Sequence, residues 1–259
     1  MVEYLELVET LWPTQYIFIL GHMRSRSTLL SHLLGSHPEI RGYTESHIKY
    51  RNLWDLPRLR WHIARATRSW PRGRYLLDKQ LHSRMYLPAS LRASDNLRVI
   101  ILVRPPLETI RSIVHMGRRT GNAHDADPLR ATAYYCERLA MLASQAIELR
   151  ERALLVDSNT LIDKPQAALS TIGEHLGLTT PLQPQYTLMQ HTGRVGAGDM
   201  SPLIRRGEIV PLRSNAPNLS LPSELIRQLA RSYAHFVDDA TAWASAIGFK
   251  TDTPLQHQL

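Results

Sequence analysis

Short apolar segments alternate with amphipathic segments along most of the chain. Four apolar segments, rich in leucine, β-branched and aromatic residues, predict buried strands at residues 15–20, 74–79, 98–103 and 152–157. Apolar residues at helical spacing predict helices near residues 27–35 and 106–114, and over 128–150, 164–178 and about 221–246. This alternation is typical of βαβ units, so we expect an α/β fold, a three-layer sandwich with a central parallel sheet flanked by helices.

The organisation of the chain favours one domain over residues 1–259. No repeat, low-complexity tract or long linker interrupts the pattern, and α/β domains of about 250 residues are common. No apolar run is as long as a membrane span, and "MVEYLELVET" at the start lacks the basic residues and apolar core of a secretory signal. Cys136 is the one cysteine, so no intramolecular disulfide can form. We therefore expect a cytoplasmic protein.

The basic charge of the chain favours anionic ligands. The sequence has 31 Lys and Arg against 23 Asp and Glu, which gives a formal net charge of +8. Most of the basic residues are arginines, and the planar guanidinium matches phosphate and sulfate better than an ammonium does. A solvated, arginine-rich surface explains the composition equally well, so the positions of individual arginines have to decide.

Polar residues follow three of the predicted strands. In parallel sheets ligands bind at the carboxyl ends of the strands, which brings residues 21–28, 78–80 and 104–106 to one edge. The first stretch, "GHMRSRST", resembles the phosphate loop G-x-x-x-x-G-K-[ST], but arginine replaces the second glycine and serine the lysine. A helix N-terminus with hydroxyls and arginines suits an anion with less charge than ATP–Mg. The alternative is that Ser27 only caps the helix and the arginines are solvated.

Three motifs in this order resemble the sulfotransferases that use 3′-phosphoadenosine 5′-phosphosulfate (PAPS). The loop "MRSRSTLL" is similar to the family's 5′-phosphosulfate loop, P-R-S-G-T-T-L-L. "VRPPLETIRS" places Ser112 eight positions after Arg104, the spacing of the family's 3′-phosphate pair. "LLVDSNTLIDKPQAALSTIGEHLGL" is similar to the family's strand, loop and P-x-x-x-L…LGL helix. The resemblance covers about residues 15–178, and it implies a P-loop-like sandwich that uses PAPS as co-substrate and no metal.

Within that family the tyrosylprotein sulfotransferase branch is nearest in motif. The ungapped run "RSRSTLLSHLLGSHPEIRGYTESH" is similar to that branch's R-S-G-T-T-L-M, H-P-x-[IV]-R and G-E-E-T-R motifs. The resemblance implies that Glu45 is the catalytic base and that Lys79 neutralises the bridging oxygen of the leaving group. Thr44 stands where the branch has its first glutamate, His47 where it has an arginine, and Gln80 where it has an aspartate. These departures concern the acceptor more than the co-substrate.

The resemblance also implies the contacts of the nucleotide. The residues expected to bind PAPS are Arg24, Ser25, Arg26, Ser27, Thr28, Arg104, Ser112 and Arg194. The loop residues face the 5′-phosphate, and the Arg104–Ser112 pair faces the 3′-phosphate. For Arg26 two alternatives stay open: its side chain reaches the phosphate or points to solvent. Arg194 lies in the glycine-rich stretch 193–207, which loosely resembles a loop that closes the nucleotide site in cytosolic sulfotransferases; an ordinary flexible loop is the alternative.

Two histidines compete with Glu45 for the role of base. Cytosolic sulfotransferases use the histidine of a Lys-x-His motif, and here His82 follows Lys79 one residue too late. His47 lies two residues after Glu45 and is a candidate for the base or for an acceptor contact. The other histidines show no spacing typical of metal ligands.

Two other functions stay open. A P-loop-like nucleotide kinase needs a Gly-Lys pair and a magnesium carboxylate, and neither is obvious. A nucleic-acid-binding protein interleaves basic and aromatic residues, as residues 49–75 do. We interpret this segment as an acceptor platform for an acidic peptide or anionic glycan, or as an ordinary amphipathic helix. The expected partner is a hydroxyl-bearing acceptor (tyrosyl peptide, sugar or small metabolite) rather than nucleic acid, and the family's habit of dimerising makes a homodimer a further expectation.

Overall fold

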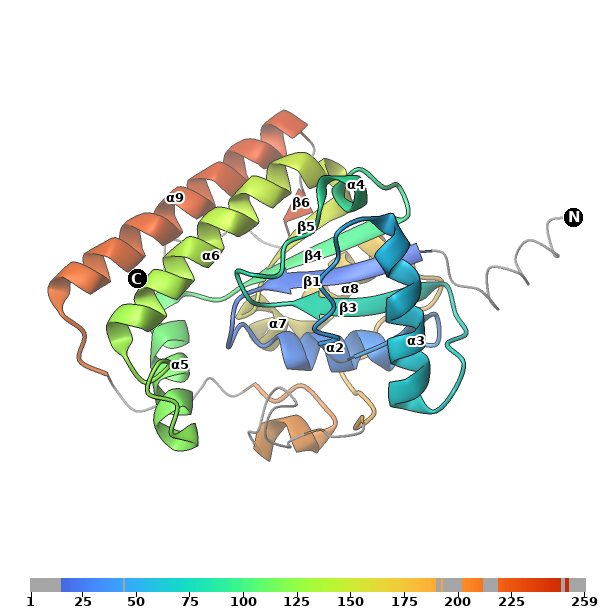
Figure 1. Cartoon of the computed structure of the whole chain (residues 1–259), viewed down its shortest axis with the longest axis horizontal. Coiled ribbons are helices and arrows are strands. Elements are labelled where there is room, and N and C mark those ends of the chain that lie inside the picture. The colour runs from blue at the N-terminus through green and yellow to red at the C-terminus, as the bar shows by residue number, and fades with distance from the viewer. Residues whose placement is uncertain are drawn as a thin grey trace, which may run out of the picture.

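Six parallel strands form one sheet at the centre of the computed structural model (Figure 1). The structure describes residues 15–43, 45–189, 192, 202–211, 219–247 and 250–251. In their order across the sheet the strands are β2 (Ile40–Arg41), β3 (Tyr75–Gln80), β1 (Gln15–Gly21), β4 (Leu97–Val103), β5 (Ala153–Asp157) and β6 (Lys250–Thr251). The four strands predicted from the sequence are confirmed, each within one residue at either end. The two edge strands were not predicted, because two residues are too few to show a period.

Helices cover both faces of the sheet, which confirms the three-layer α/β sandwich (Figure 1). Residues of α3, α5, α6 and α9 pack in the core on one face, and residues of α2 and α8 pack on the other. The helices are α2 (Ser27–Gly35), α3 (Leu56–Thr67), α4 (Ala89–Arg92), α5 (Pro106–Thr120), α6 (Pro128–Leu149), α7 (Thr160–Asp163), α8 (Pro165–Leu176) and α9 (Ser223–Ile247). The five predicted helices are confirmed, and the one at 106–114 continues to Thr120, where Gly121 adopts a left-handed conformation with φ of 69°.

The central strands are apolar throughout because both of their faces are covered. In β1, Phe18 and Leu20 point into the core on the α6 face, and Ile17 and Ile19 point into the core on the α2 face. All four side chains are fully buried. A strand of this kind reads as a continuous apolar run instead of an alternating one.

The carboxyl ends of the strands meet at one edge of the sheet. Leu20 at the end of β1 lies opposite Gln80 of β3, Gly21 lies opposite Leu102 of β4, and Val103 lies opposite Asp157 of β5. The loops that follow β1, β3 and β4 therefore meet, as expected for a ligand site in a parallel sheet. Within the described ranges, no helix is long and apolar enough to cross a membrane.

Candidate active site

The loop between β1 and α2 approaches the neighbouring backbone closely. A Cβ atom on Gly21 would lie 2.8 Å from the carbonyl oxygen of Leu102 and 3.0 Å from Oγ of Ser25, so only glycine fits. Arg24 and Arg26 both adopt left-handed conformations, with φ of 64° and 65°. That conformation is uncommon for residues with a side chain, and it explains why phosphate-binding loops of this type carry a glycine at the position of Arg26.

The side chain of Arg26 turns toward the end of β5 and away from solvent. Its Nη1 donates to the carbonyl oxygen and Oγ of Ser158, both at 3.1 Å, and to Oδ1 of Asn159 at 2.5 Å. Nη2 lies 3.8 Å from Oε2 of Glu108, and the side chain is 13% exposed. Burial, and then repulsion from Arg104, lower the pKa of Arg26 to about 10. Of the two sequence-based alternatives for Arg26, a solvent-facing side chain is therefore wrong.

Arg24 and Arg104 connect the loop to α5. Nε of Arg24 donates to Oγ of Ser112 at 2.9 Å. Nη1 of Arg104 donates to the carbonyl oxygen of Arg24 at 3.3 Å, while Nε and Nη2 donate to Oε2 of Glu108 at 3.1 and 2.8 Å. The structure thus brings together the arginine expected at the 5′-phosphate and the pair expected at the 3′-phosphate.

A buried histidine fixes the junction of the ends of β1 and β4. Nδ1 of His22 lies 2.9 Å from the carbonyl oxygen of Met23, and Nε2 lies 3.0 Å from the backbone nitrogen of Arg104. Because that N–H donates to Nε2, the proton of the neutral ring is on Nδ1. Burial lowers the pKa of His22 to about 3, so the ring is neutral at neutral pH. His22 was not among the residues predicted from the sequence.

The start of α2 fits an anionic group. No acidic residue lies in its first turn, so no carboxylate neutralises the positive end of the helix dipole. Oγ of Ser25 is buried and has no hydrogen-bond partner in the described part of the chain. Nζ of Lys79, on β3, donates to Oγ1 of Thr28 at 3.3 Å. Ser27 is buried next to them. Three hydroxyls, an ammonium and the helix N–H groups can together hold the phosphate end of a nucleotide.

The candidate bases lie side by side. Oε1 of Glu45 is 3.8 Å from Nε2 of His82 and 4.0 Å from Nδ1 of His47. The same oxygen is buried and accepts no hydrogen bond from any described residue. The glutamate side chain is 14% exposed, whereas the two histidines are 43% and 62% exposed. A carboxylate between two imidazoles can accept a proton from a hydroxyl group directly, or orient a histidine that does so.

Asp78, on β3, holds the segment that contains Glu45 against that strand. Its carboxylate accepts hydrogen bonds from the backbone N–H and Oγ of Ser46, at 2.9 and 2.5 Å, from the hydroxyl of Tyr50 at 2.8 Å and from the N–H of Lys79 at 2.8 Å. Burial raises the pKa of Asp78, while these donors lower it. Sequence reasoning missed this residue, although an aspartate inside an apolar strand was a signal.

Three residues on one side of α6 hold the strand ends in register. Arg138 is fully buried and donates only to carbonyl oxygens in the described residues: Gly21, Gln80, His82 and Met85, at 2.7 to 3.3 Å. Tyr134 accepts from the N–H of Met23 and donates to the carbonyl of Leu81, and Tyr135 donates to the carbonyl of Arg104. The sequence signal was an arginine on the apolar side of an amphipathic helix.

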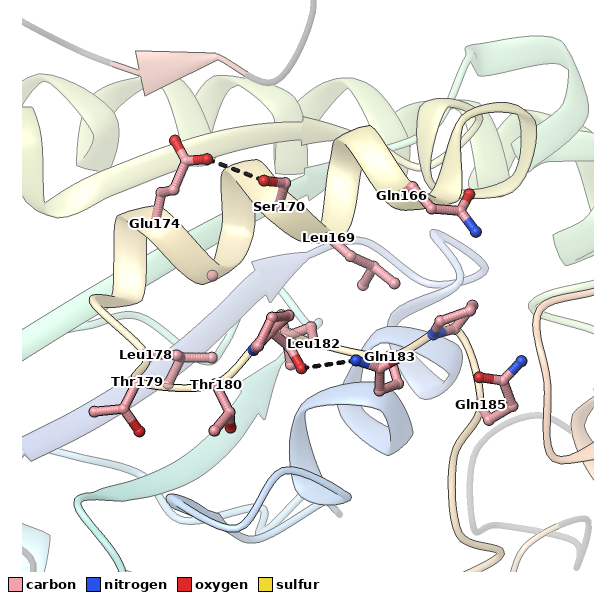
Figure 2. Close-up of a pocket in the computed structure, with 13 residues that line it drawn as sticks. Gln166, Leu169, Ser170, Glu174, Leu178, Thr179, Thr180, Leu182, Gln183 and Gln185 are labelled. Carbon is pink, nitrogen blue, oxygen red and sulfur yellow. Dashed lines mark hydrogen bonds between the residues drawn. The ribbon is translucent and has the colours of Figure 1, made fainter.

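The other predicted positions lie elsewhere. Arg194, with most of the stretch 193–207, is outside the described residues. Residues 53–67 form a short 3₁₀ helix, Leu53–Asp55, followed by α3. A pocket of about 540 Å³ lies between α8 and residues 178–185 (Figure 2). Thr180 in its wall contacts His37, beyond the C-terminal end of α2, so the pocket lies away from the loop at the start of that helix.

Comparisons with known proteins identify the fold. No family model and no curated protein matches the chain. Among solved structures, it is similar to the sulfotransferase domain of the Synechococcus PCC 7002 olefin synthase, with a TM-score of 0.56 and 20% identity over 86% of this chain and 94% of that one. It is also similar to the sulfotransferase domain from the curacin biosynthetic pathway, with a TM-score of 0.57 and 19% identity over 92% of this chain and 99% of that one. The chain therefore has the fold of sulfotransferase domains, as the motifs imply.

Proposed function

We propose that the chain is a sulfotransferase that moves a sulfuryl group from PAPS to a hydroxyl-bearing acceptor. The observation that carries the proposal is the network of Arg24, Arg104 and Ser112, which joins the loop after β1 to the strand end of β4. A nucleotide with phosphates on both the 5′ and 3′ positions needs basic and hydroxyl groups for each phosphate, and this network brings two arginines and a hydroxyl together. A nucleoside triphosphate, in contrast, needs a lysine at the loop and a magnesium carboxylate.

The loop and Lys79 supply the charge for the transfer step in this proposal. The acceptor oxygen forms a bond to sulfur while the bond from sulfur to the 5′-phosphate oxygen breaks, and 3′-phosphoadenosine 5′-phosphate (PAP) leaves. Nζ of Lys79 lies next to Thr28 at the start of α2, so it is suited to neutralise the oxygen of the leaving phosphate. Removing a donor of this kind costs on the order of 10²–10³ in rate. Side-chain cations take the place of a metal, so turnover is expected to survive EDTA.

Glu45 is the proposed base. Its buried Oε1 accepts no hydrogen bond from the described residues, which suits a group that receives the acceptor proton. His82, 3.8 Å away, is in reach of the same proton. The structure therefore supports a Glu45–His82 pair in which the glutamate takes the proton and the histidine contacts the acceptor.

Nucleotide selectivity tests the proposal. Because Arg104 and Ser112 are assigned to a 3′-phosphate, PAP is expected to raise the melting temperature more than AMP or ATP–Mg at the same concentration. The comparison with AMP isolates the 3′-phosphate, since the two nucleotides differ only there. Equal stabilisation by AMP would contradict the assignment, and turnover that is lost with EDTA and restored by Mg²⁺ would favour a kinase.

A further inference from the structure

A line of two tryptophans and three arginines begins on the 3₁₀ helix Leu53–Asp55 and runs along the outer side of α3 to its C-cap. Trp54, Arg58, Trp61, Arg65 and Arg68 are three or four positions apart, a spacing that aligns side chains on one side of a helix. All five are exposed, and the two tryptophans are 88% and 66% exposed. We call these five residues the Trp–Arg stripe.

The Trp–Arg stripe is not part of the hydrophobic core. The inner side of α3 carries Leu56, Leu59 and Ile63, which are buried in the core against the sheet. The outer tryptophans lie on the opposite side, where Trp61 meets the ring of Trp70 edge to face, with centroids 5.5 Å apart. Exposed aromatic side chains of this size, gathered in one place, mark interaction surfaces more often than isolated apolar residues do.

The stripe carries excess positive charge. Residues 51–74 contain seven arginines and a single acidic residue, Asp55. Oδ1 of Asp55 pairs with Arg58 at 3.0 Å. Arg65 and Arg68 form no salt bridge with any residue in the described part of the chain. The surface therefore complements carboxylates, and Trp and Arg are the residue types that contribute most to binding at protein interfaces.

The spacing of the stripe points to a helical ligand. Trp54, on the 3₁₀ helix that leads into α3, and Trp61, on α3, are seven positions apart, and a facing helix repeats its apolar residues every seven positions. A membrane surface fits less well, because interfacial helices present a continuous apolar face with basic residues outside it. Here Arg58 lies between the two tryptophans on the same line.

We propose that the Trp–Arg stripe is a docking surface for an acidic amphipathic helix of a partner protein. Apolar residues of that helix pack on Trp54 and Trp61, and its carboxylates pair with Arg58, Arg65 and Arg68. The stripe includes none of the residues of the candidate active site, so this proposal is independent of the sulfotransferase assignment.

A synthetic helical peptide tests the proposal with the whole chain. The peptide has 15 residues, about four turns, with leucines seven positions apart and glutamates at the three- and four-residue steps between them. A scrambled peptide of the same composition is its control. The designed peptide is expected to bind at least about tenfold more tightly than the scrambled one, and more weakly as salt is added. Trp61→Ala and Arg65→Glu should each weaken its binding by about tenfold or more.

Arg231→Glu is the matched control variant, because Arg231 is also an exposed arginine on a helix. That helix, α9, lies far from α3 (Figure 1). It should bind the designed peptide like the unmodified chain. An equal loss with Arg231→Glu, or equal binding of the scrambled peptide, would show attraction to net charge alone and overturn the proposal. Stripe-dependent binding to phosphatidylserine vesicles or to a single-stranded oligonucleotide, stronger than to the peptide, would also overturn it. PAP binding of every variant, measured in parallel, reports separately on the nucleotide site.

Discussion

Nε of Arg24 donates a hydrogen bond to Oγ of Ser112 at 2.9 Å, although 88 positions separate the two residues. The family motifs assign the arginine to the 5′-phosphate and the serine to the 3′-phosphate. The contact joins the two assignments, and Arg104 extends it by donating to the carbonyl oxygen of Arg24. If a nucleotide binds here, Arg24 and Ser112 therefore contact it while each is positioned by the other.

This coupling predicts that Arg24→Ala and Ser112→Ala weaken PAP binding in a non-additive way. Each substitution should weaken binding by about tenfold, the effect of one charge-assisted hydrogen bond. The double variant should lose less than the product of the two effects, with a coupling energy of about 0.5–1 kcal/mol. Titration calorimetry with PAP and AMP measures both effects. Strictly additive losses would mean that the two side chains contact the nucleotide independently.

The Glu45–His82 pair predicts unequal kinetic effects. Glu45→Gln keeps the shape of the side chain and removes the base, so kcat should fall by about 10²-fold or more, with PAP affinity nearly unchanged. His82→Asn should reduce kcat much less. Glu151→Gln, a substitution of an exposed glutamate, is the control. Normal turnover by Glu45→Gln together with an inactive His82→Asn would transfer the role of base to the histidine.

Asp78 is expected to act by positioning the Glu45 segment. Asp78→Asn keeps the size of the side chain. Where the amide NH₂ replaces Oδ2, however, it cannot accept the hydrogen bonds that the hydroxyls of Ser46 and Tyr50 donate. We expect kcat to fall by about tenfold or more while PAP affinity changes by less than about threefold. Asp95→Asn, at a fully exposed carboxylate, controls for the charge change. A parallel loss of PAP binding would indicate a general structural defect instead.

Arg138 is expected to contribute strongly to stability. Arg138→Met leaves several buried carbonyl oxygens without a donor, and each costs about 1–3 kcal/mol. Urea unfolding should show a free energy of unfolding lower by at least about 3 kcal/mol. If that variant does not fold, Arg138→Lys, which keeps the charge and part of the donors, should show a smaller loss in the same assay. Arg130→Met, on the exposed side of α6, should have little effect.

His22 predicts a pH dependence of stability. Its pKa is about 3 in the folded chain and near 6.5 when unfolded, so the unfolded state binds the extra proton between these values. The neutral ring therefore stabilises the fold above pH 6.5, and this stabilisation is lost as the pH falls. Between pH 7 and pH 5 the loss amounts to about 2 kcal/mol. His22→Gln should remove that part of the slope in urea unfolding, whereas His124→Gln, at an exposed histidine, should retain it.

The sequence alone determined the layered α/β fold and the edge of the sheet where the candidate site lies. Strand and helix periods are local properties, so the ends of β1, β4 and α6 could be predicted within one residue. A parallel sheet brings the carboxyl ends of its strands to one edge. Only the tertiary structure decided where the long side chains point. Arg26 lies against Ser158, Arg24 against Ser112, and Glu45 beside His82. These contacts join residues between 37 and 132 positions apart along the chain, and they depend on how helices pack on the sheet, which no local pattern records.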